Sequence, residues 1–524
     1  MERLADHCLH GTQILVSRLS KNIVYNVLGQ GLSVVLGFVA VRFVFRSLGG
    51  DALGLIYFSL AFSGALSVVL QLGICQSAVR EVASHHADRP EYIASFIRTS
   101  SLFYWTGYLT LAIIAYTLAP YLVYHWVNLD SLDAPTAVRI LRILSLGALV
   151  GLPGGLYRAL LVGLQRLDLT NVIDVSAKGL QQGGIFLILL MHGSLFAVVY
   201  WIVACLTMTL LAYLFVCTRF FSVRALLLPG FSRAVVRQNV GYASGLMTIT
   251  LCAWLLTEAD KVIVSKLLPL TLLGIYTFAR SAIGQGMLLT GAINNAIFPH
   301  FSALHGAGKT SEMLRAYHKI QDLVCFGTIP IFAVAPFAAI PLLSRVFDAP
   351  SAHLLLLPVT FLCIGYYMNG ALTAPYVVSL AVGRPDITAR QNFIALFVII
   401  PTSIIAIYFF GLSGAGFSLV VYHIFAYSCG LPRICRECLG MPATVWYWHV
   451  LRILGSAILI YGCAWIALAS LGSFSVIALA AAYVLATLVY GVVAFWIMGE
   501  ELRQKIIGFV NPLRLKMREA VVPD

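Results

Sequence analysis

Long apolar runs separated by short polar segments dominate this chain. A run of about 20 residues is long enough to cross a hydrocarbon core of roughly 30 Å as a helix. We place fourteen such runs at residues 22–45, 53–78, 100–126, 140–164, 171–191, 195–217, 240–266, 272–299, 319–346, 352–382, 388–410, 412–432, 449–471 and 474–498. The pattern predicts an all-α polytopic membrane protein with fourteen transmembrane helices.

The composition agrees with this prediction. Of the 524 residues, 60% are hydrophobic and only 10% are charged, whereas a soluble domain has about 25% charged residues. The net charge of +13 could indicate binding to nucleic acid. Most Lys and Arg residues of the chain, however, lie between the apolar runs, as the positive-inside rule requires. We therefore expect no nucleic-acid partner.

The Lys and Arg residues set the orientation of the helices. Twenty-five of them fall in alternate segments that we assign to the cytoplasm, against three in the opposite segments, or five if Arg139 and Arg142 at a helix mouth are included. Both termini are therefore predicted to be cytoplasmic in a multi-pass protein of the inner (plasma) membrane. Residues 1–21 are expected to form an interfacial cytoplasmic segment and residues 499–524 a basic cytoplasmic tail.

Two segments of the sequence are each repeated later in the chain, at nearly the same distance along it. Arg46, Leu48, Leu53, Gly54 and Phe58 coincide in register with a cation, Leu, Leu, Gly and Phe in residues 266–278, and the segment 166–170 is answered by 384–388. A shared spacing indicates a duplicated half. We expect two parallel-repeat lobes of six helices, at residues 22–217 and 240–438, joined by a cytoplasmic linker at 218–239 and followed by a C-terminal helix pair at 439–498.

The loops leave no room for a soluble catalytic domain, since none exceeds about 25 residues. A membrane glycosyltransferase or polymerase would need catalytic carboxylates or histidines on a sizeable outer loop. The longest predicted outer loop, Asn128–Thr136, offers only Asp130 and Asp133. The chain is therefore predicted to be no enzyme, and no cofactor or metal is expected.

Several motifs together resemble a known family. They are Arg46-x-Leu-Gly-x4-Gly54, Leu72-Gly-Ile-x5-Arg80-Glu, Asp260-x5-Lys266-x7-Gly274-x-Tyr276 and Gly383-Arg-Pro-Asp386. In this order, and with fourteen spans, the chain is similar to the polysaccharide flippases of the multidrug/oligosaccharidyl-lipid/polysaccharide exporter superfamily, and to the O-antigen type in particular. It departs from that pattern by a denser charge cluster at residues 258–261.

This resemblance implies a transporter of undecaprenyl-diphosphate-linked oligosaccharide. Such a protein would flip its substrate from the inner to the outer leaflet by alternating access, for the assembly of cell-surface polysaccharide. Its partners would be the lipid-linked oligosaccharide, membrane lipids, a proton or a sodium ion, and a polysaccharide polymerase or glycosyltransferase. The alternative within the superfamily is a cation-coupled multidrug antiporter.

Flippases of this kind are thought to hold the headgroup in a cationic cavity. Cations within the predicted spans are the candidates to bind the diphosphate, because Arg pairs with phosphate oxygens bidentately and Lys acts as a point charge. They are Arg42, Arg158, Lys178, Lys261 and Arg280. The other interpretation is that these side chains reach the lipid headgroups, which suits those near the ends of spans.

Two carboxylates are candidates for coupling to an ion. Glu258 and Lys261 are three residues apart on one helix face, so an ion pair within the helix is the alternative to a functional role. Asp260 points in another direction and is the better candidate to bind a proton.

Overall fold

The structure is a computed structural model that describes residues 35–86, 88–472, 475–500, 502–504 and 507. The predicted interfacial segment at 1–21 and most of the predicted basic tail lie outside these residues. The chain forms two compact units, unit 1 up to Ile275 and unit 2 from Tyr276. The division into two six-helix lobes and a helix pair stays a prediction.

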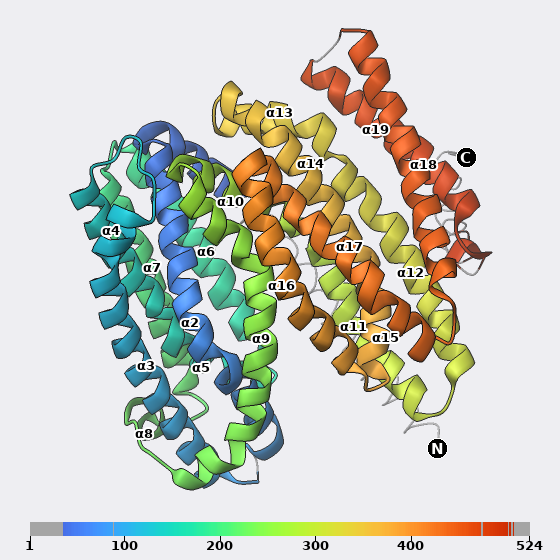
Figure 1. Ribbon diagram of the computed structural model, residues 1–524. Coiled ribbons are helices and arrows are strands. Elements are labelled where there is room, and N and C mark those ends of the chain that lie inside the picture. The colour runs from blue at the N-terminus through green and yellow to red at the C-terminus, as the bar shows by residue number, and fades with distance from the viewer. Residues whose placement is uncertain (1–34, 87, 473–474, 501, 505–506, 508–524) are drawn as a thin grey trace, which may run out of the picture. The chain divides into compact units, whose positions relative to one another are not determined.

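Unit 1 is built from helices with short connections. Helix α9 packs along α2, and α5 packs on α2 and α7 (Figure 1). A core of buried side chains that includes Phe96, Tyr104 and Tyr157 joins α2, α3, α5, α7 and α8. After a helical stretch at 35–48, the helices are α2 (Gly50–His85), α3 (Pro90–His125), α4 (Ala134–Leu149), α5 (Gly151–Gly163), α6 (Leu167–Leu190), α7 (Leu195–Cys217), α8 (Val223–Leu227), α9 (Arg233–Leu267) and the start of α10 (Leu270–Gly284).

Unit 2 contains several helices that break within one predicted apolar run. Helix α17 packs on both α14 and α16, and α18 and α19 form a hairpin (Figure 1). After α10 come the 3₁₀ helix η1 (Gln285–Met287), α11 (Leu288–Gly306), α12 (Thr310–Ala333), α13 (Ala335–Val346), α14 (Ala349–Ala371), α15 (Thr373–Ala381), α16 (Pro385–Phe410), α17 (Leu412–Glu437), α18 (Ala443–Ser470) and α19 (Val476–Ile497).

The all-α polytopic fold is confirmed, but the count of fourteen spans is not. Nine segments of the described chain are long and apolar enough to cross a membrane, or ten if α12 and α13, which are bent by 43°, form one span. Every predicted run from residue 53 onward nevertheless coincides with one helix or with successive helices. Each of these runs therefore falls in helix, although hydropathy alone does not show where a helix breaks.

The first pair of repeated segments packs together in unit 1. Gly54 and Gly274, which are equivalent in the repeat, approach so closely that a Cβ on Gly274 would lie 2.8 Å from the Gly54 backbone nitrogen. A Cβ on Gly54 would lie 2.0 Å from the Leu270 carbonyl oxygen. Only glycine permits this contact between α2 and the start of α10, in the way that small residues let membrane helices approach.

Asp51 forms hydrogen bonds that stabilise the same contact between α2 and α10. Its buried carboxylate accepts hydrogen bonds from the backbone N–H groups of Asp130, Ser131 and Leu132, at 2.6–3.1 Å. The hydroxyl of Thr271, the residue equivalent to Asp51 in the repeat, donates to it at 3.0 Å. One carboxylate thus joins α2, the α3–α4 loop and α10, and these bonds offset the cost of burying its charge.

The second pair of repeated segments forms the same turn in the two units. Arg166 donates through Nε and Nη2 to both carboxylate oxygens of Asp168, at 3.0 and 2.9 Å, and Arg384 binds Asp386 in the same way at 2.9 and 3.1 Å. In each turn the residue before the Arg has a positive φ, 58° and 79°. The hydrogen bonds from Arg166 hold the pKa of Asp168 below its usual range. The shared geometry supports duplication.

Two tyrosines of α19 bind the backbone of α12 where a proline interrupts it. Pro330 has no N–H, so the carbonyl of Phe326 lacks its helical partner, and the Tyr490 hydroxyl donates to this carbonyl at 3.4 Å. The Tyr483 hydroxyl donates at 2.8 Å to the carbonyl of Pro330, beside the bend between α12 and α13. Side chains of the C-terminal hairpin therefore supply the hydrogen bonds that the bent helix lacks.

Candidate functional site: an uncharged polar cavity in unit 2

A cavity of about 380 Å³ lies within unit 2, between α11, α14, α15, α16 and α17. Two glycines of α17 bring this helix close to α16 and α14. A Cβ on Gly414 of α17 would lie 2.0 Å from the carbonyl oxygen of Ala406 in α16, and one on Gly416 would lie 2.6 Å from that of Pro358 in α14. The cavity is lined by Met287, Thr290, Gly291, Asn294, Asn369, Leu372, Thr373, Tyr376, Thr388, Gln391, Asn392, Tyr422, Leu431 and Ile434.

Two breaks in regular helix border this cavity. The 3₁₀ turn Gln285–Met287 separates α10 from α11, and α14 ends at Ala371 before α15 begins at Thr373. At the second break the Leu372 N–H donates to the carbonyl of Asn369 at 3.1 Å, three residues back rather than four. Irregular backbone at membrane depth is tolerated where it is buried in protein or lines a cavity, and such discontinuous helices mark substrate sites in transporters.

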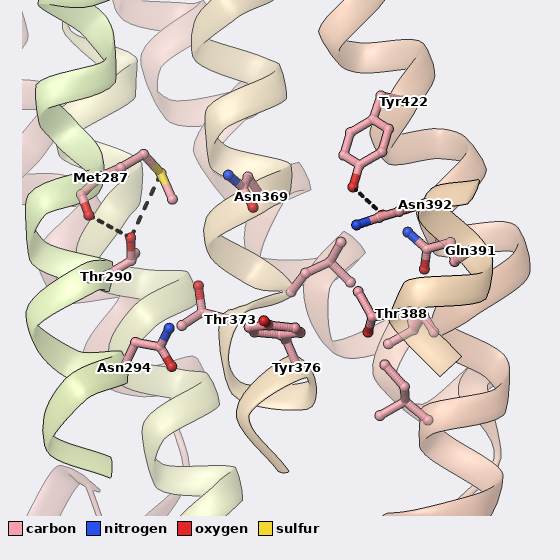
Figure 2. Close-up of a pocket in the computed structure, with 14 residues that line it drawn as sticks. Met287, Thr290, Asn294, Asn369, Thr373, Tyr376, Thr388, Gln391, Asn392 and Tyr422 are labelled. Atoms are coloured by element: carbon pink, nitrogen blue, oxygen red, sulfur yellow. Dashed lines mark hydrogen bonds between the residues drawn. The ribbon is translucent and has the colours of Figure 1, made fainter. Parts of the chain in front are cut away.

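The lining is polar but carries no formal charge. Four carboxamides, three threonines and two tyrosines face the cavity, and none of its fourteen residues is acidic, basic or histidine. The Tyr422 hydroxyl donates to Asn392 Oδ1 at 2.9 Å, and the Thr290 hydroxyl donates to the carbonyl of Met287 at 2.8 Å (Figure 2). Such a surface offers many donors and acceptors to a ligand but no counter-charge to an ion.

Arg158 pairs with a carboxylate across two helices of unit 1. Its Nε lies 3.2 Å from Oδ2 of Asp174 on α6, and the Tyr213 hydroxyl of α7 donates to Oδ1 of the same carboxylate at 2.6 Å. The Arg158 side chain is still 51% exposed. One carboxylate therefore orients this guanidinium while leaving much of it accessible.

The charge cluster on α9 contains the ion pair between Glu258 and Lys261 that is the alternative to a functional role. Lys261 Nζ lies 2.7 Å from Oε2 of Glu258, and both side chains are largely buried. Asp260, in the same turn, is 7% exposed. The pair stabilises two charges in an apolar helix, and the role of Asp260 in ion coupling stays a prediction.

The other predicted cations occupy different helices. Arg42 is half-buried in the helical stretch 35–48, and Lys178 is exposed on α6. Arg280 lies on α10 in unit 2 and is 8% exposed. None of the five cations and neither of the two predicted carboxylates lines the cavity, and their roles in binding a diphosphate or an ion remain predictions.

The sequence reasoning missed the cavity because it searched for charges. The sequence nonetheless contains carboxamides that could have indicated this cavity. Asn369, Gln391 and Asn392 fall inside predicted spans, where a carboxamide is costly unless it finds a polar partner. Their clustering in two consecutive spans would have indicated a polar surface at the junction of those helices.

Comparisons with known proteins identify a family and a relative that match much of the chain. The profile of a family described as polysaccharide biosynthesis protein matches residues 19–305. The chain is 20% identical over 404 residues to a putative O-antigen transporter of Shigella flexneri, covering 76% of this chain and 93% of the relative.

Two solved structures share its fold. One is the lipid II flippase MurJ in an inward closed conformation, with a TM-score of 0.69 at 13% identity over 90% of this chain and 99% of that one. The other is an inward-facing multidrug resistance transporter of the MATE family in the MOP superfamily, with a TM-score of 0.61 at 14% identity over 77% and 95% of the two chains.

Proposed function

This chain belongs to the polysaccharide biosynthesis protein family, and from this premise we propose that it is a flippase for a lipid-linked oligosaccharide. The substrate would be an undecaprenyl-diphosphate-linked glycan, moved from the inner to the outer leaflet of the inner membrane by alternating access. The name of the Shigella flexneri relative, a putative O-antigen transporter, supports a glycan of this type. The named relatives are transporters, in agreement with the prediction that the chain is no enzyme.

The observation that carries this proposal is the uncharged polar cavity in unit 2. A glycan attached to a lipid must cross an apolar barrier without losing the hydrogen bonds that its hydroxyl groups make with water. A surface of carboxamides and hydroxyls between apolar helices replaces those bonds. The cavity is thus suited to a hydroxyl-rich cargo within a chain that is otherwise 60% hydrophobic.

The second candidate function is cation-coupled multidrug antiport, because the fold is shared with a MATE transporter. A site for cationic drugs benefits from a carboxylate that offsets the positive charge of the ligand. None of the residues that line the cavity is acidic. This chemistry favours the glycan over the drug.

A deletion strain tests the proposal directly. Loss of a flippase should leave the lipid-linked oligosaccharide on the inner leaflet. We expect spheroplasts of the deletion strain to accumulate lipid-linked sugar that a membrane-impermeant oxidant does not reach, and plasmid-borne protein to restore its labelling. An unchanged distribution of the glycan, together with increased sensitivity to cationic drugs, would favour the antiporter instead.

A further inference from the structure

We infer that the unit 2 cavity binds the uncharged sugar residues of the cargo and not its diphosphate. This inference rests on the proposed function and assigns one part of the substrate to one set of residues. It starts from the different locations of charged and uncharged polar side chains in the chain. The lining of the cavity has no charged side chain, whereas the predicted diphosphate ligands, such as Arg158 and Arg280, lie elsewhere.

The chemistry of the lining matches a sugar. Each carboxamide presents one acceptor oxygen and two donor hydrogens, and neighbouring hydroxyls of a pyranose likewise both donate and accept. Asn294 comes from α11, Asn369 from α14, and Gln391 and Asn392 from α16. The carboxamides therefore approach from three helices, as a ligand bound on several sides requires. A diphosphate would instead need Arg, Lys or a cluster of backbone N–H groups.

Several of these polar groups remain available to a ligand. Within the part of the chain that the structure describes, the side chains of Asn294, Asn369 and Thr373 form no hydrogen bond with protein, and Asn369 is exposed to the cavity. Figure 2 shows the three directed into the space between the helices. Asn392 accepts from Tyr422 through Oδ1, which orients its amide group and leaves the nitrogen as a donor.

The tyrosines add a second kind of contact. Tyr376 of α15 is 37% exposed and lies beside Thr373 at the helix break. An aromatic face packs against the C–H face of a sugar ring, while carboxamides bind its edges. The volume of about 380 Å³ falls within the range of ordinary small-molecule sites, roughly 300–1,000 Å³.

The test compares cargoes that differ only in their sugars. Purified protein in proteoliposomes would be given undecaprenyl diphosphate without a sugar, and the same lipid bearing the complete oligosaccharide of the host cell. Asn369→Leu keeps the approximate size of the side chain but removes its hydrogen bonds, and no bond to protein is lost. We expect flipping of the oligosaccharide to fall about tenfold, since lost bonds to a ligand cost that much in rate, and flipping of the lipid without a sugar to fall much less.

A second variant and a matched control keep the test independent of folding. The second variant is Thr388→Val, at a residue that lines the cavity. The control is Thr402→Val on the same helix, at a residue outside the lining whose hydroxyl donates to the carbonyl of Val398. Only Thr388→Val should reduce oligosaccharide flipping. Equal loss of both cargoes in Asn369→Leu and Thr388→Val, or no loss of either, would overturn the assignment to sugar. A wild-type protein that moves neither cargo would refute the proposed function and this inference with it.

Discussion

Replacing Gly54 by Ala should separate the two repeated segments in unit 1. The new Cβ would lie 2.0 Å from the oxygen and 2.6 Å from the carbon of the Leu270 carbonyl. Because a carbon and an oxygen atom need about 3.3 Å between them, the backbones of α2 and α10 must part by roughly 1 Å. A backbone carbonyl cannot turn away as the end of a flexible side chain can.

The expected magnitude follows from two opposing effects. Inserting a methyl group into a closely packed contact costs about 1–3 kcal/mol, and the separation also weakens the bond from Thr271 to Asp51. Alanine gains about 1 kcal/mol over glycine in helix propensity. We expect a net loss of about 1–2 kcal/mol for Gly54→Ala, seen as a lower Tm of the detergent-solubilised protein in tryptophan fluorescence.

Gly64→Ala is the matched control. Gly64 lies on the same helix, and a Cβ there would meet nothing within 4 Å. The control should keep or slightly raise the Tm, because it gains helix propensity without a clash. Equal melting temperatures for the two variants would show that the contact between Gly54 and Leu270 does not hold unit 1 together.

Two further predictions concern charged groups. Asp51→Ala leaves three backbone N–H groups without their acceptor, so the Tm should fall by the equivalent of about 3 kcal/mol. Asp133 is an exposed helix cap in the same loop, and Asp133→Ala should lower the Tm less. A larger fall for Asp133→Ala than for Asp51→Ala would contradict this account. Arg158→Ala or Arg280→Ala should abolish glycan export at unchanged protein levels, whereas Arg166→Ala, in a turn, should not. Normal export by both of the first two variants would remove these residues from the substrate site.

The fold was predictable from sequence in its elements but not in its breaks. Apolar runs identify helices because every backbone polar group in hydrocarbon must bond internally. The same runs conceal interruptions, because the residues at a break such as Leu372 are as apolar as their neighbours. Here the predicted span 352–382 is two helices, α14 and α15, and the predicted span 272–299 contains a 3₁₀ turn.

The site was less predictable than the fold. Charged residues attract attention in an apolar sequence, and the pairing of Glu258 with Lys261 could be anticipated because it lies within one turn. The partner of Arg158 could not, since Asp174 lies on another helix and its approach depends on tertiary packing. Neutral side chains such as Asn369 and Thr388 indicate a binding site only once five separate helices bring them to one cavity.

The bond between Tyr483 and the carbonyl of Pro330 has a consequence for the evolution of chain length. A carbonyl in an apolar environment without a donor costs several kcal/mol, and Pro330 leaves a second such group at Phe326, which is met by Tyr490. A shorter homologue that ended before α18 would have to replace this proline or recruit other hydroxyls. The proline and the two final tyrosines should therefore have been gained and lost together.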